Sequence, residues 1–164
     1  VFVAERSERG VLDGLRAGRT FISSQPPVQR APQILLSADS DGDGDFESRV
    51  GDTVAATAAY RARVIGAAGT LLNIVANGGE RVFDAVPVIG DDFEFEFRLP
   101  PGRTWVRAEI MQPDLAPERA QICDGLVGDQ TTYCRNRLLV QAMTSAIFNA
   151  GAVTNGGVSA NLGE

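Results

Sequence analysis

Residues 92–98 read Asp-Phe-Glu-Phe-Glu-Phe-Arg, and this stretch decides the fold class. Phenylalanine occupies every second position, while the positions between are charged. Because successive side chains of a strand point to opposite faces, the pattern predicts a β-strand with one buried and one solvated face. The following Pro100-Pro101-Gly102 predicts the end of that strand.

The same two-residue period recurs along most of the chain. Tyr60, Ala62 and Val64 alternate with arginines, which places the tyrosine on the inward face. Further strands are predicted at 20–23, 33–38, 71–76, 81–86 and 104–110, with one or two more within 137–148. Short strands separated by glycine- and proline-containing turns are typical of a mainly β protein. The predicted fold is an antiparallel immunoglobulin-like β-sandwich.

One short α-helix is expected before these strands, over residues 7–18. Ser7 can accept hydrogen bonds from the free N–H groups at the helix start, and Gly18 can adopt the left-handed conformation just past its end. Val11, Leu12 and Leu15 form the apolar stripe of this amphipathic helix. At the other end, 150–164 is rich in glycine, asparagine and alanine and is expected to be a flexible tail.

The composition excludes many kinds of chemistry. The chain has no histidine, and all 15 of its Lys+Arg residues are arginine. The absence of histidine excludes Ser-His-Asp and Cys-His triads and histidine-ligated zinc. The absence of lysine excludes a Schiff-base or P-loop lysine. No catalytic residue is predicted in this chain, and whether it belongs to an enzyme stays open.

Charge and hydropathy restrict the partners. The net charge is −6, from 15 basic and 21 acidic residues. Without a basic stripe, nucleic acid is not an expected partner, because such binding relies on clustered cations. No apolar run approaches membrane-spanning length, so no membrane span is expected. The chain begins at Val1, which suggests a processed product or a piece of a longer protein.

An acidic loop is the segment that most clearly indicates a ligand. Its carboxylates occupy alternate positions, at Asp39, Asp41, Asp43, Asp45 and Glu47. The spacing and a glycine at the sixth position match the start of an EF-hand loop, and they predict a structural Ca²⁺ site. Val50 stands at the twelfth position, where an EF-hand has a bidentate glutamate, so Glu47 or Asp52 would have to complete the coordination. The alternative is a solvated acidic turn.

Two other groups of residues leave alternatives open. Cys123 and Cys134 flank a polar stretch, and they predict either a local disulfide or two buried free thiols. A disulfide implies an oxidising location: secreted, periplasmic or at the cell surface. Trp105, with Arg103 and Arg107 beside it, is either a platform for a sugar or anion or an aromatic cover on one face of the sandwich.

Several segments, taken in order, resemble one family. Residues 11–21 (VLDGLRAGRTF) are similar to the helix-to-strand stretch that ends the catalytic domain of PHP-superfamily metallohydrolases of the CehA/McbA-like branch. Matches to the family's downstream β-domain are Gly-Asp-Thr-Val at 51–54, the strand at 71–78, Trp-Val-Arg-Ala at 105–108 and Thr-Ser-Ala-Ile-Phe at 144–148. In the last segment Ala146 replaces the family's usual proline. The resemblance covers roughly residues 1–149.

The resemblance implies an accessory role. The family's catalysis depends on histidine and aspartate ligands in an upstream α/β barrel, and without histidine none can be assigned here. Residues 1–24 would then be the remnant of that catalytic domain and 25–149 the β-sandwich domain. The expected function is a non-catalytic accessory domain of an exported phosphohydrolase, with the upstream catalytic domain as its partner. The alternative is a stand-alone extracellular calcium-dependent adhesion or carbohydrate-binding module. The oligomeric state stays open.

Overall fold

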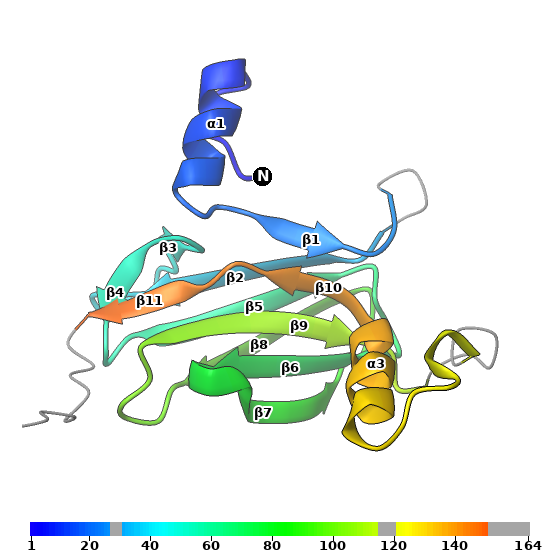
Figure 1. Cartoon of the computed structure of the whole chain (residues 1–164). Helices are drawn as coiled ribbons and strands as arrows, with labels where there is room; N and C mark the ends of the chain where they lie inside the picture. Colours follow the sequence, from blue (N-terminus) through cyan, green and yellow to red (C-terminus); the bar gives the residue numbers. More distant parts are fainter. Residues whose placement is uncertain (27–30, 115–120, 151–164) are drawn as a thin grey trace, which may run out of the picture.

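The protein is a β-sandwich of two sheets, shown in Figure 1. The structure, a computed structural model, describes residues 1–26, 31–114 and 121–150. In the view of Figure 1 the larger sheet lies in front of the smaller one. The predicted tail at 150–164 lies outside the described residues, apart from Ala150. The mainly β prediction is confirmed.

The smaller sheet has four antiparallel strands in the order β3-β2-β5-β8. These are β2 (Gln33–Asp39), β3 (Ser48–Arg49), β5 (Ala59–Ile65) and β8 (Asp92–Arg98). Side chains of β5 alternate between buried and half-buried, and Tyr60 is fully buried, as its alternation with arginine predicts. On β8, Phe97 is buried and stacks on Tyr60, with 5.4 Å between the ring centroids.

The larger sheet is organised around β9 (Trp105–Met111). One edge of β9 pairs with β6 and the other pairs with β10 and then β11. Further out, β7 pairs with β6, β1 pairs with β10, and β4 pairs with β11. All these pairs are antiparallel except that of β4 and β11. The strands are β1 (Phe21–Ser23), β4 (Thr53–Ala55), β6 (Leu71–Ala76), β7 (Glu80–Pro87), β10 (Val140–Thr144) and β11 (Ile147–Ala150). A short 3₁₀ turn, η2 (Asn77–Gly79), joins β6 to β7.

The core lies between the two sheets. Inward side chains of β2 and β5 meet those of β6 and β9, and the fully buried members of this core are aliphatic apart from Tyr60. The fully buried members include Ile34, Val64, Leu72, Ile74, Val106 and Ile110. Burial of alternate positions on β5 explains why a period of two in the sequence was sufficient to predict that strand.

The predicted N-terminal helix is present as α1 (Glu8–Arg16). Ser7 Oγ accepts a hydrogen bond from Gly10 N at 3.0 Å, and Gly18 has a φ of 69°. The apolar stripe, however, is not covered: Val11, Leu12 and Leu15 are 41%, 43% and 49% exposed. Figure 1 shows α1 standing away from the two sheets. The stripe was therefore predicted correctly as a pattern, but it does not contribute to the sandwich core.

A second helix corrects the prediction for the C-terminal third of the described chain. Residues 129–139 form α3 (Asp129–Leu139), where a polar loop and the start of a strand were expected. The strand begins only at Val140. This segment has little apolar periodicity, so the pattern that reveals amphipathic helices gave no signal here. Cys134 lies on α3 and Cys123 at the end of η3 (Gln121–Cys123), a 3₁₀ turn.

Candidate metal site

The acidic loop joins β2 to β3. Asp39 is the last residue of β2, and its side chain is only 5% exposed, because the strand carries it into the sheet. One carboxylate oxygen accepts a hydrogen bond from Gly42 N at 2.6 Å, and the other accepts one from Gly44 N at 3.1 Å. Gly42 and Gly44 have φ values of 85° and 96°, a conformation that favours glycine. The glycines thus let the chain wrap around the Asp39 carboxylate.

The loop brings four carboxylates together. One oxygen from each of Asp39, Asp41, Asp43 and Glu47 lies within 4.8 Å of the others. Two oxygens bound to one Ca²⁺ at about 2.3–2.6 Å cannot be more than about 5 Å apart, so this spacing is compatible with a shared Ca²⁺. The donors are all oxygen atoms, which hard cations prefer. A Ca²⁺ ion takes six to eight ligands, so water or a backbone carbonyl, such as that of Asp45, would complete the shell.

Glu47 closes the loop from its far end. Its carboxylate accepts hydrogen bonds from the side chain and the backbone N–H of Ser40 and from Ser48 Oγ. The hydrogen bond from the Ser40 hydroxyl is the main reason that the pKa of Glu47 is lowered. The neighbouring Phe46 ring packs under the guanidinium of Arg61, 3.9 Å from its centroid, and holds this part of the loop on β5.

The other predicted ligands are placed differently. The carboxylate of Asp45 is not part of the group of four. Asp52 forms an ion pair with Arg19 at 3.1 Å and accepts a hydrogen bond from Arg49 N at 2.9 Å. Asp52 therefore connects the segment after α1 to the turn between β3 and β4. Val50, at the position where an EF-hand has glutamate, is buried in the core. Glu47, and not Asp52, joins the carboxylate group.

The two cysteines lie at disulfide distance. The sulfur atoms of Cys123 and Cys134 are 2.07 Å apart, and Cys123 is buried. The bond links η3 to α3 across a sequence separation of 11. The first of the two sequence-based alternatives is therefore the one found. The bond lies in a different part of the fold from the acidic loop.

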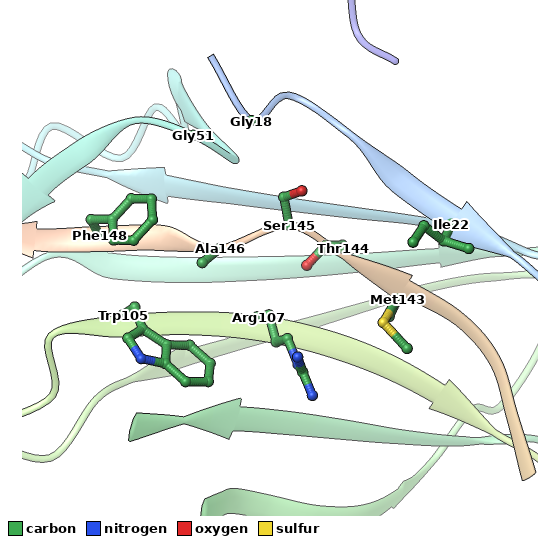
Figure 2. Close-up of a pocket in the computed structure, with 10 residues that line it drawn as sticks. All are labelled: Gly18, Ile22, Gly51, Trp105, Arg107, Met143, Thr144, Ser145, Ala146 and Phe148. Carbon is green, nitrogen blue, oxygen red and sulfur yellow. The ribbon is translucent and has the colours of Figure 1, made fainter. Parts of the chain in front are cut away.

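A second candidate site is a groove on the outer face of the larger sheet, shown in Figure 2. It has a volume of about 510 Å³. Trp105 and Phe148 are register partners on β9 and β11, so their rings lie on the same face of the sheet. The remaining lining residues are Gly18, Ile22, Gly51, Arg107, Met143, Thr144, Ser145 and Ala146.

Among the residues that line the groove, Arg107 is the one with a charged side chain. The Arg107 guanidinium lies 5.9 Å from the Trp105 ring centroid and forms an ion pair with the nearly buried Glu109 at 2.6 Å. Ile22 and Phe148 are 65% and 46% exposed, so the groove has an open apolar surface. The sequence identified Trp105 and Arg107, but not Phe148 or Ile22. Only strand pairing could show that these residues share a face.

Comparison with protein-family models, with curated proteins and with solved structures finds no match for this chain. Inferences about function therefore start from the acidic loop, the groove and the exposed stripe of α1. In the described part of the chain no helix is long and apolar enough to cross a membrane.

Proposed function

We propose that this chain is a non-catalytic accessory β-sandwich domain of an exported PHP-type metallohydrolase. The observation that carries the proposal is the exposed stripe of α1. A helix of nine residues is not stable alone in water, and an amphipathic helix normally packs its apolar face on a neighbour. Val11, Leu12 and Leu15 instead face away from the sandwich core. The upstream catalytic domain of the same polypeptide would cover them.

The inventory of residues supports a non-catalytic role. The sequence has no histidine or lysine, so it lacks the histidine ligands of a PHP-type metal cluster and the commonest general base. The carboxylates of the acidic loop are engaged by backbone and serine donors. We propose that this loop binds Ca²⁺ and stabilises the turn between β2 and β3. The cysteine pair supports a secreted, periplasmic or cell-surface location, because disulfides persist in oxidising compartments.

The reading frame upstream of Val1 tests this proposal. It is expected to encode an α/β barrel with histidine and aspartate ligands. In the full-length protein, hydrogen exchange of α1 should be slower than in this chain alone, because the barrel covers the stripe. The purified chain should show no phosphodiesterase turnover. An upstream frame without such a domain, or turnover by the chain alone, would contradict the proposal.

The groove supports a second candidate function, a calcium-dependent adhesion or carbohydrate-binding module. An indole face next to an arginine offers a stacking surface and hydrogen-bond donors, which suit a sugar ring. Trp105 is the chain's one tryptophan, so its fluorescence reports on the groove directly. A glycan that quenches this fluorescence, and whose binding is lost on chelation, would favour the second candidate. Absence of binding across a glycan array would exclude it.

A further inference from the structure

Strand β8 is an edge strand with an open side. It is the last strand of the four-stranded sheet, and in the described part of the chain it pairs only with β5. Its pairing with β5 runs without a register shift through all seven residues, from Asp92 to Arg98. The N–H and C=O groups of β8 that point away from β5 therefore form a regular row. Such a row is a template for pairing with another strand.

Apart from the charged side chains on its outward face, the usual protections of an edge are missing from β8. Natural edge strands are often short, bulged, or interrupted by proline or lysine. The opposite edge of the same sheet, β3, has only two residues. The edge strand β7 of the other sheet pairs irregularly with β6 and contains Ala85 at a φ of 55°. Strand β8 has none of these features.

The inward face of β8 is also incompletely covered. Phe97 is 7% exposed, but Phe93 and Phe95 are only partly buried where they pack against the core. Phe83 of β7 contacts Phe95 in a T-shaped arrangement, with 5.4 Å between the ring centroids. A further strand beside β8 would remove apolar ring surface from water, which is favourable.

We propose that β8 pairs with β8 of a second copy of this chain, antiparallel and centred on Phe95. Side chains alternate between faces, so a pairing that keeps all phenylalanines on the core side must place charged residues opposite charged residues. The register centred on Phe95 uses all seven residues of each strand. It places Asp92 opposite Arg98 of the second copy at both ends, and Phe93 opposite Phe97. The two four-stranded sheets then form one continuous sheet.

A balanced face favours a second copy as the occupant. The outward side chains of β5 and β8 include three arginines and three carboxylates, so two copies bring no net charge together. The register makes two opposite-charge pairs of Asp92 with Arg98, although Asp92 also pairs with Arg63 of its own β5 at 2.5 Å. It also places Glu94 opposite Glu96 of the second copy twice, which alone would be unfavourable. Each of these glutamates already contacts an arginine of its own β5: Arg61 lies 2.6 Å from Glu96, and Arg63 lies 3.6 Å from Glu94. The aromatic pairs on the other face add to the stability.

Sedimentation equilibrium of the full chain tests the pairing. We expect a monomer–dimer equilibrium over roughly 1–100 μM. Arg98→Asp should weaken the dimer about tenfold or more, since it places two carboxylates opposite each other at both ends. The matched control is Arg9→Asp, which makes the same charge change at a side chain 91% exposed on α1 and should leave dimerisation unchanged. Because Arg98 also donates to Thr57 O, circular dichroism must show that the variant remains folded.

Cross-linking then tests the register. A mixture of one chain carrying Glu94→Cys and another carrying Glu96→Cys should form an intermolecular disulfide under mild oxidation, because opposed Cβ atoms in a strand pair approach to about 5 Å. Either variant alone should cross-link much less, and mass spectrometry separates the new bond from Cys123–Cys134. A chain that stays monomeric, or a dimer indifferent to Arg98→Asp and without this cross-link, would overturn the proposal. So would pairing of β8 with an unrelated peptide by a chain that does not self-associate.

Discussion

The hydroxyl of Tyr60 on β5 donates a hydrogen bond to Asn149 Oδ1 on β11 and so joins the two sheets through the core. Asn149 also donates from Nδ2 to Arg103 O at 2.7 Å, which anchors the turn before β9. Tyr60 is fully buried, so this hydroxyl has no access to water. One tyrosine therefore combines an apolar ring in the core with a polar link between opposite layers.

The first prediction is that the folded protein resists ionisation of Tyr60. Burial raises the pKa of Tyr60 to about 12. Because the folded state holds the Tyr60 proton more tightly than the unfolded state, this residue contributes its full stability below pH 10, the ordinary tyrosine pKa. That contribution to the free energy of unfolding is lost as the pH rises from about 10 to about 12. Absorbance at 295 nm should show a late tyrosine titration that is missing from Tyr60→Phe. The stability of Tyr60→Phe should fall less over this pH range than that of the wild type; equal losses would contradict the prediction.

The second prediction concerns calcium in the acidic loop. If the ion binds only the folded state, a concentration 100 times its dissociation constant adds about 2.7 kcal/mol and raises the melting temperature by roughly 5–10 °C. Asp41→Ala should abolish this rise, because it removes one of the four convergent carboxylates. Asp45→Ala, in the same loop but outside that group, should keep most of it. Identical melting curves with calcium and with chelator would exclude the site.

The third prediction concerns the attachment of α1. Gly51 has a φ of 90°, and a Cβ there would lie 1.8 Å from Ala17 O at the end of the helix. Gly102 has a φ of 84° but nothing within 4 Å of such a Cβ. Gly102→Ala should therefore cost only the backbone strain, roughly 1–2 kcal/mol, while Gly51→Ala should cost more and loosen α1. Chemical denaturation measures the first effect, and the rate of tryptic cleavage near Arg19 measures the second. Similar results for the two variants would show that α1 is not held at Gly51.

The fourth prediction concerns Asn73, a buried polar residue on β6. Asn73 Oδ1 accepts a hydrogen bond from Ala85 N at 2.7 Å, where Ala85 has a φ of 55°. Asn73→Ala should lower the free energy of unfolding by roughly 1–3 kcal/mol, because Ala85 N–H loses its partner. Ala85→Gly should instead raise it by up to about 1 kcal/mol, since glycine adopts positive φ without strain. Urea denaturation of both variants measures these opposite changes in the free energy of unfolding. Destabilisation by Ala85→Gly would refute the explanation.

Sequence patterns predicted most of the strands, though not the short β3 and β4, because burial in a sandwich often repeats every second residue. The run at 92–98 and the alternation around Tyr60 are sufficient for β8 and β5. The helix α3 was missed because its sequence has little apolar periodicity. The Ser7 cap and the left-handed Gly18 were found because these are local backbone effects that each depend on one residue type.

The candidate sites were only partly predictable, because some of their residues are neighbours in sequence and others meet only in the folded chain. The alternating carboxylates between 39 and 47 are neighbours in sequence, so their convergence follows from local turns. Asp52 lies further along the chain, and it pairs with the distant Arg19 instead of joining the carboxylates. The groove around Trp105 needs Phe148 and Ile22, which reach the same face only through strand pairing.

By itself, the sequence determined the fold class, the short helix, the acidic loop and the exclusion of histidine- and lysine-based chemistry. These depend on side-chain period, on single capping residues and on composition, all of which are local properties. Only the tertiary structure decided that the stripe of α1 is exposed, that Glu47 and not Asp52 joins the carboxylates, and that β8 is an open edge. Each of these depends on which distant segments pack together, and the free energy of that packing belongs to the whole chain.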